Sequence, residues 1–170
     1  MADTALGWAQ VEQGPEWLYL KANCERQLKK SDAARATYAR LLAQQPAHPL
    51  ATPAAYEQAL VAFEQKNFQA VAAMSREASV TNEFAEDFLW MVAESQAALG
   101  RRVEAMAAYG QVAQRFAAGR RALLSAFQRA RLLREQGDQV AAAEAFRDVA
   151  SRSGTNALAG DALMQSALAR

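Results

Sequence analysis

The chain has 170 residues, of which 52% are hydrophobic and 8% aromatic, and this length and apolar content suffice for one domain with a buried core. Its 19 basic and 18 acidic residues give a formal net charge of +1, which excludes a global electrostatic attraction to nucleic acid or to an anionic membrane. Much of the apolar fraction is alanine, which loses no side-chain entropy in a helix, so an all-helical protein is expected.

The first part of the chain predicts a short helix followed by an irregular helix pair. Residues 3–13 have apolar side chains at helical spacing, and Gly14 ends that pattern. Pro15 suits the first turn of the next helix, because a proline there loses no hydrogen bond. We therefore expect a helix pair over residues 15–50, whose second helix stops at the proline-rich segment 46–53.

A second helix pair is expected over residues 52–81. Its two helices are separated by a break near Lys66 and Asn67. The apolar spacing of its second helix is interrupted at Glu77 and Ser79, which makes this pair less regular than the others.

The clearest pairs follow at residues 83–118 and 119–153. Gly100 and Gly137 separate the two helices of each pair and suit the left-handed turn that ends a helix. Residues 157–169 predict one more helix, which has no downstream partner in the sequence.

The four pairs repeat in one phase. A small residue of the second helix recurs at intervals of 36, 35 and 37 residues, at Ala34, Ala70, Ala105 and Ala142. An aromatic or methionine side chain follows four positions later in each pair, at Tyr38, Met74, Tyr109 and Phe146. Self-similarity at this period, with helical spacing inside each unit, predicts a solenoid of helical hairpins.

This pattern resembles the tetratricopeptide repeat (TPR) family over roughly residues 15–152. The match is carried by small, glycine, aromatic and closing proline positions: Ala22, Ala34, Tyr38, Pro46, Ala93, Gly100, Ala105, Tyr109, Ala130, Gly137, Ala142 and Phe146. Lys29 and Gln65 stand where the family usually has glycine. The resemblance implies one all-α domain over residues 1–170, a right-handed α-solenoid of antiparallel helix pairs with about four repeats plus terminal helices.

The endings of the last two pairs resemble a TPR subtype found in bacterial envelope proteins, including periplasmic and outer-membrane assembly factors. The endings in question are Tyr109, Val112 and Phe116, then Phe146 and Val149. Many cytoplasmic members look alike, so cytoplasm and periplasm both stay open. Residues 1–4 lack the basic and apolar regions of a signal peptide, and no apolar run reaches the roughly 20 residues that span a bilayer.

In such a solenoid the first helices of the pairs line a concave groove. The resemblance implies that the groove-facing residues are Tyr19, Asn23, Arg26, Tyr56, Phe63, Trp90, Glu94, Phe127, Arg131 and Arg134. Trp, Tyr and Arg often anchor interfaces, because they supply rigid area or several hydrogen bonds. We therefore expect a protein–protein interaction module or scaffold that binds a peptide or partner helix in the groove.

Some family members hold the C-terminal carboxylate of a peptide with asparagine and basic side chains. Asn23 and Arg26 fit that role. Tyr56, Asp87 and Met91 stand where further polar or basic residues are needed, so this binding mode is not expected here.

Two alternative functions stay open. One is polyanion or nucleic-acid binding by a basic patch that comprises Arg115, Arg120, Arg121, Arg129, Arg131 and Arg134. Nearby acids argue against a continuous basic stripe: Glu83, Glu86, Asp87 and Glu94. The other alternative is a structural segment of a larger repeat protein that self-associates through the C-terminal helix.

Catalysis finds little support in the sequence. His48 is the only histidine and lies in a proline-rich loop, so no histidine-based triad can form. Cys24 is the only cysteine, which excludes an intramolecular disulfide and a multi-cysteine metal site, and we expect it to be buried as a small hydrophobe. No phosphate-binding loop occurs, so we expect neither an enzyme nor a metal or cofactor site.

Overall fold

The computed structural model describes residues 14–78, 82–153 and 157–168, and within these the chain forms ten helices and no strand. This confirms the predicted all-α class. The helix expected at residues 3–13 lies outside the described residues. In the part of the chain that the structure describes, no helix has the length and apolar content needed to cross a bilayer.

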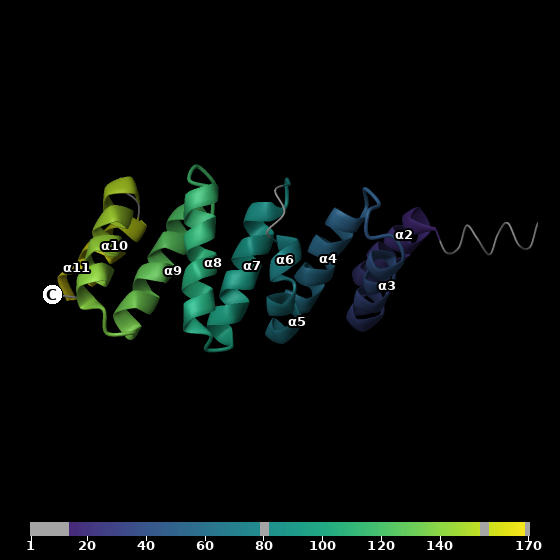
Figure 1. The fold of residues 1–170 in the computed structure, drawn as a ribbon, viewed down its shortest axis with the longest axis horizontal. Coiled ribbons are helices and arrows are strands. Elements are labelled where there is room, and N and C mark those ends of the chain that lie inside the picture. The colour runs from purple at the N-terminus through teal and green to yellow at the C-terminus, as the bar shows by residue number, and fades with distance from the viewer. Residues whose placement is uncertain (1–13, 79–81, 154–156, 169–170) are drawn as a thin grey trace, which may run out of the picture. The chain divides into compact units, whose positions relative to one another are not determined.

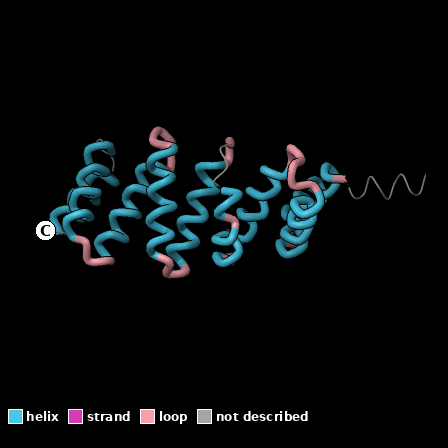
Figure 2. The backbone as a smooth tube through the Cα atoms, viewed as in Figure 1, coloured by secondary structure: helices cyan, strands magenta, loops and turns pink. Residues whose placement is uncertain are grey.

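The chain divides into two compact units, Met1–Val80 and Thr81–Arg170. Figures 1 and 2 show the helices of which each unit is built. The boundary falls between the second and third predicted helix pairs. Each unit therefore holds two of the four predicted pairs, and the assignment of all 170 residues to one domain stays a prediction.

Unit 1 is built from consecutive helices that pack side by side: α2 (Pro15–Gln27), α3 (Ser31–Gln44), α4 (Ala51–Glu64), α5 (Phe68–Ala73) and α6 (Ser75–Ala78). Its core contains the buried side chains Leu18, Ala22, Ala34, Tyr38, Leu41 and Ala54. The small residues at the helix crossings let the backbones approach, and the one large ring, Tyr38, fills the space between α2 and α3.

Unit 2 continues the same plan with α7 (Ala85–Ala98), α8 (Arg102–Arg115), α9 (Ala122–Glu135), α10 (Gln139–Ser153) and α11 (Ala157–Leu168). Tyr109 and Phe146 are 2% and 0% exposed, as expected for the ring that follows the small residue of each second helix. The core at the end of this unit contains Ala130, Ala142, Ala143, Phe146, Val149 and Ala162.

All four helix pairs use one type of turn. The second residue after the first helix has a positive φ, of 60° at Lys29, 57° at Lys66, 72° at Gly100 and 90° at Gly137. The next backbone N–H donates to the carbonyl five residues back, as Lys30 does to Glu25 at 2.9 Å. This left-handed ending satisfies the last carbonyls of the first helix and turns the chain back along it.

The register predicted for the second pair is wrong by one residue. The left-handed residue is Lys66 and not Gln65, so the small core position five residues later is Val71 and not Ala70. Val71 is 0% exposed, whereas Ala70 is only half-buried. The second helix of this pair also breaks at Met74, which divides it into α5 and α6 and leaves Met74 half-buried.

Cys24 is exposed, so the prediction that it is a buried core residue is wrong. Leu18 and Ala22 define the buried side of α2, and both are 0% exposed. Cys24 follows Ala22 by two positions, which is about 200° around a helix and places it on the opposite side.

Candidate functional site

In unit 2 the first helix of each pair, α7 in one and α9 in the other, lines a small cavity of about 220 Å³ that we call the unit 2 cup. Its lining consists of Glu94, Ala97, Tyr109, Gln128, Arg131, Leu132 and Glu135. Two of the ten predicted groove residues, Glu94 and Arg131, therefore meet in one site. Tyr109 reaches the cup from the second helix α8, and the sequence had indicated it only as a core ring.

A hydrogen bond from a buried tyrosine fixes Glu94 in the cup. The Tyr109 hydroxyl donates to Glu94 Oε1 at 2.7 Å, and the Tyr109 side chain is 2% exposed. Burial and this acceptor carboxylate raise the pKa of Tyr109, while Arg131 opposes the shift. Tyr109 therefore stays protonated and holds one carboxylate oxygen of Glu94 in place.

Arg131 is the one exposed residue among the ten predicted groove residues. Its guanidinium donates to Gln128 Oε1 at 3.0 Å and lies 3.8 Å from Glu135 Oε1, both on its own helix. Glu135 also lies 4.0 Å from Arg102 Nε. The two ion pairs are long and join partly exposed groups, so each contributes little to stability.

The other predicted groove residues of unit 2 lie outside the lining of the cup. The Trp90 ring is half-buried, and the Arg121 guanidinium lies 3.8 Å from its centroid. Phe127 packs edge-on against buried Phe146, with ring centroids 5.3 Å apart. Arg134 donates a hydrogen bond to Gln165 of α11.

Unit 1 has a counterpart of the cup that its own side chains fill. The Tyr38 hydroxyl donates to Asn23 Oδ1 at 2.8 Å, and the Tyr19 ring stands edge-on to Tyr38 at 6.1 Å. Arg26 Nε lies 3.4 Å from Glu57 Oε2. Burial and the Glu57 carboxylate raise the pKa of Tyr38, and the charge of Arg26 opposes the shift.

Of the predicted groove residues in unit 1, Tyr19 and Asn23 thus contact Tyr38, and Arg26 contacts Glu57. Phe63 instead packs edge-on against Phe68 of α5, with centroids 5.9 Å apart. Tyr56 is half-buried on α4. The aromatic residues of the first helices are therefore mainly packing residues, and the polar residues beside them shape the surface.

The six arginines of the predicted basic patch do not form one stripe. Arg120 and Arg121 pair with Asp87, and the backbone N–H of Arg121 donates to Glu86 Oε1 at 2.7 Å. Burial alone would raise the pKa of Asp87, but the hydrogen bonds and charges of the two arginines outweigh it, and the pKa is lowered. Arg115 lies over the Phe116 ring, so the arginines serve separate local contacts.

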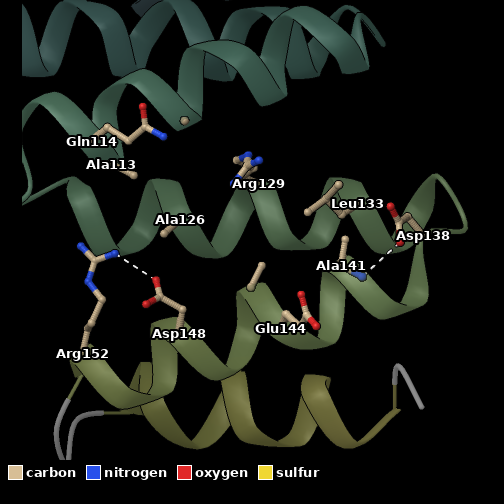
Figure 3. Close-up of a pocket in the computed structure, with 12 residues that line it drawn as sticks. Ala113, Gln114, Ala126, Arg129, Leu133, Asp138, Ala141, Glu144, Asp148 and Arg152 are labelled. Atoms are coloured by element: carbon tan, nitrogen blue, oxygen red, sulfur yellow. Dashed lines mark hydrogen bonds and ion pairs between the residues drawn. The ribbon is translucent and has the colours of Figure 1, made fainter.

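A second groove, of about 620 Å³, lies on the other side of α9, between α8 and α10 (Figure 3). Five of its twelve lining residues are small, namely Gly110, Ala113, Ala126, Ala141 and Ala145, and most of the others are polar or charged. Arg129 reaches into it from α9, so this arginine faces away from the unit 2 cup. Sequence reasoning missed this groove, although the run of small residues on the outer sides of α8 and α10 was a usable signal.

No metal site is visible among the described residues, because no three His, Cys, Asp or Glu side chains gather there in a suitable way. His48 Nε2 lies 3.3 Å from a Glu16 carboxylate oxygen, and its Nδ1 accepts from the Leu50 N–H at 3.2 Å. The histidine therefore has a local structural role at the start of α4.

Comparison with known proteins supports the TPR assignment. The tetratricopeptide repeat family model matches residues 18–48 and 87–118, which lie within the first and third predicted pairs. No curated protein sequence matches the chain.

Solved structures of TPR-like repeats share the fold. TPR-like repeats assigned to a kinesin light chain of Podosopora anserina are 18% identical, with a TM-score of 0.63, over 92% of this chain and 86% of that one. A variant of the same protein with one glutamine replaced by methionine gives 18% identity and a TM-score of 0.63, over 89% and 82%. At this identity the likeness shows the fold alone, an α-solenoid of TPR-like helix pairs.

Proposed function

We propose that the chain binds a peptide or helical segment of a partner protein on the surface formed by its first helices. The TPR repeats and the TPR-like fold support a protein-interaction scaffold in general. The observation that carries the specific surface is the unit 2 cup, where α7 and α9 enclose a site whose central carboxylate is already oriented. Groups held in place before binding lose little conformational entropy when a partner arrives.

The TPR fold is typically a non-catalytic interaction module, and the chemistry of the cup agrees with that role. Glu94 is committed to a tyrosine that stays protonated, and Arg131 to hydrogen-bonding and ionic contacts along its own helix. Neither arrangement presents a nucleophile next to a base. We therefore propose binding and not catalysis.

The test is to block the cup and, separately, the groove on the opposite side of α9. Gln128→Trp places an indole over the cup, and Gln114→Trp places one in the groove lined by α8 and α10. Each purified variant is compared with the wild type by affinity capture from source-cell lysate and mass spectrometry. A protein lost with Gln128→Trp and retained with Gln114→Trp supports the proposal, whereas identical captures by all three forms would refute it.

Self-association is a second candidate, favoured by the outer side of α11. Leu163, Met164 and Leu168 are 58%, 55% and 70% exposed on this helix. Two copies that pack these side chains together would become monomers in the variant Leu163→Lys/Met164→Lys. Sedimentation equilibrium compares it with Leu20→Lys, a control on α2 whose leucine is 64% exposed. A wild type that is monomeric at all concentrations removes this candidate.

The envelope subtype is a further proposal that rests only on the endings of the last two repeats. Fractionation of source cells tests it: recovery with the periplasmic or membrane fraction supports the subtype, and recovery with the cytoplasm opposes it. The described residues do not favour polyanion binding, because Arg129 and Arg131 face different sides of α9 and both Arg120 and Arg121 pair with Asp87.

A further inference from the structure

We propose that the unit 2 cup receives an arginine side chain of the partner, with Glu94 as its counter-ion. This inference rests on the proposed function, because it specifies what the partner segment presents to the cup. The inference comes from comparing the two units. The equivalent site is filled by an arginine of the chain in unit 1 and is open in unit 2.

The two sites correspond residue by residue. A shift of 71 positions converts four residues of unit 1 into four that line the cup: Asn23 to Glu94, Arg26 to Ala97, Tyr38 to Tyr109 and Glu57 to Gln128. The same shift relates the left-handed turn residues Lys29 to Gly100 and Lys66 to Gly137, so the backbone supports the alignment. The tyrosine hydroxyl also donates to the equivalent residue in both units, at 2.8 Å and 2.7 Å.

In unit 1 an arginine occupies this site. Arg26 Nε lies 3.4 Å from Glu57 Oε2, and Arg26 follows Asn23, the acceptor of the Tyr38 hydroxyl, by three residues on α2. Its side chain is 33% exposed and that of Glu57 18% exposed, so the pair is largely shielded from water. The arrangement of tyrosine, carboxylate and guanidinium is thus complete within the chain itself.

In unit 2 the arginine is missing and the carboxylate has moved. Ala97 replaces the arginine, which leaves the cavity of about 220 Å³, and Glu94 replaces the asparagine next to the tyrosine. The site therefore keeps a tyrosine and an acid but lacks an arginine at the position of Arg26, and the arginine that lines the cup, Arg131, stands where unit 1 has Leu60. A partner's arginine would restore the full set.

The charge of Glu94 is not balanced within the described residues. Its hydrogen-bond donor, the Tyr109 hydroxyl, is neutral, and no cation described here lies within 4.0 Å of its carboxylate. Arg131 also lines the cup, yet its guanidinium contacts Gln128 and Glu135 on its own helix. A partly buried carboxylate without a counter-ion attracts a guanidinium, which can donate two parallel hydrogen bonds.

The walls of the cup suit the rest of an arginine side chain. Ala97 and Leu132 are apolar and half-buried, so they can cover the methylene stem while the guanidinium reaches Glu94. Glu135 already has Arg102 at 4.0 Å and Arg131 at 3.8 Å, which leaves Glu94 as the main attraction for an added cation.

The experiment titrates the whole ¹⁵N-labelled chain with the peptide N-acetyl-Ala-Arg-Ala-amide and follows amide shifts by NMR at fixed salt. The control peptide carries citrulline, which has the same shape but no charge. We expect saturable shifts centred on Ala97, Gln128 and Leu132 with the arginine peptide, and at least fivefold weaker binding of the citrulline peptide. Equal binding of both peptides, or no saturable shift at these residues, overturns the proposal.

Three variants sharpen the test. Glu94→Gln keeps an acceptor for Tyr109 but removes the charge, so it should weaken arginine binding at least fivefold, while Glu104→Gln, an exposed acid outside the cup, should not. Ala97→Arg supplies an arginine at the position that Arg26 has in unit 1 and should abolish binding of the peptide. If Glu104→Gln weakened peptide binding as much as Glu94→Gln does, the effect would come from the overall charge of the protein. That result would overturn the proposal.

This outcome is separable from that of the blocking experiment. If Gln128→Trp prevents partner capture but the arginine peptide shows no preference for the cup, the interaction surface stands and its arginine specificity falls. If the peptide binds the cup but Gln128→Trp captures the same proteins as the wild type, the cup binds arginine and the proposed partner surface is wrong.

Discussion

The Tyr109 hydroxyl donates a 2.7 Å hydrogen bond to Glu94, fifteen residues earlier in the chain. The contact from Tyr38 to Asn23 spans the same fifteen residues in the other unit, at 2.8 Å. In each case a ring from the second helix fixes a polar side chain at the surface of the first helix. The repeated core position therefore also orients the residue that a partner would meet.

Tyr109→Phe should lower the free energy of unfolding by about 1–2 kcal/mol, because it removes a hydrogen bond to a charged, half-buried acceptor and little volume. Tyr109→Ala should cost about 3–5 kcal/mol, since it also empties the core position. Urea unfolding of both variants measures these losses. A Tyr109→Phe protein as stable as the wild type would show that the hydrogen bond contributes nothing.

Alkaline pH should destabilise the protein through the same tyrosines. Burial raises the pKa of Tyr109 and of Tyr38 above the usual value near 10, so the unfolded chain releases these protons before the folded one does. Their contribution is complete below pH 10 and is lost as the pH rises above it, by about 1.4 kcal/mol per pH unit for each such group.

Urea unfolding at several pH values from about 9 to 11 tests this dependence. Above pH 10 the stability of Tyr109→Phe should fall less steeply than that of the wild type. Phenylalanine has no hydroxyl to ionise, so only Tyr38 of the two tyrosines still contributes to the pH dependence. Parallel losses in the two proteins would mean that Tyr109 ionises equally well in both states.

The sequence sufficed for the helical repeat because its strongest signals are local. Gly100 and Gly137 mark left-handed turns, and the small residue five positions later and the ring four beyond it are buried as predicted, at Ala105 and Tyr109 for example. Each of these requirements is met by one residue type at one spacing, which is why the pattern can be read without a structure.

The site was less predictable, because it depends on which side chains meet. Lys66 adopts a conformation usual for glycine, so nothing in the residue type indicated that it, and not Gln65, is the turn residue. Arg121 had been assigned to a basic patch, yet it pairs with Asp87 and lies over Trp90. Contacts between residues about 30 apart follow from packing and not from periodicity.

The two lysines at left-handed turns predict a simple stabilisation. Lys29 has a φ of 60°, which costs a residue with a side chain about 1 kcal/mol relative to glycine, so Lys29→Gly should raise the free energy of unfolding by about that amount. Gly100→Ala, at a φ of 72° with open space around the added carbon, should lower it by a similar amount. Thermal unfolding of both variants provides the comparison, and two changes of the same sign would contradict it.

Two buried serines of unit 2 should be dispensable. Ser95 and Ser125 are 0% exposed, and neither hydroxyl has a hydrogen-bond partner among the described residues. Ser95→Ala or Ser125→Ala should therefore stabilise the protein by about 1 kcal/mol, since alanine removes an unsatisfied group and favours helix. Ser166→Ala is the control: its buried hydroxyl donates to the Ala143 carbonyl at 3.1 Å, so this change should destabilise.

Two glycines of unit 2 should respond in opposite ways to alanine. At Gly119 an added methyl group would collide with the Glu86 carboxylate, which accepts the Arg121 N–H at 2.7 Å just before α9. Gly119→Ala should therefore displace Glu86 and lower the free energy of unfolding by about 1–2 kcal/mol, the worth of a hydrogen bond to a charged group. At Gly110, inside α8, the nearest atoms would lie 3.7 Å away on Arg129, an ordinary contact.

Gly110→Ala should accordingly stabilise the protein by up to about 1 kcal/mol, because alanine restricts the unfolded chain and favours helix. Urea unfolding of the two variants, each compared with the wild type, measures both effects in one series. If Gly119→Ala were as stable as Gly110→Ala, Glu86 could be displaced without loss of free energy of unfolding. Its hydrogen bond to Arg121 would then contribute nothing to holding the start of α9 against α7.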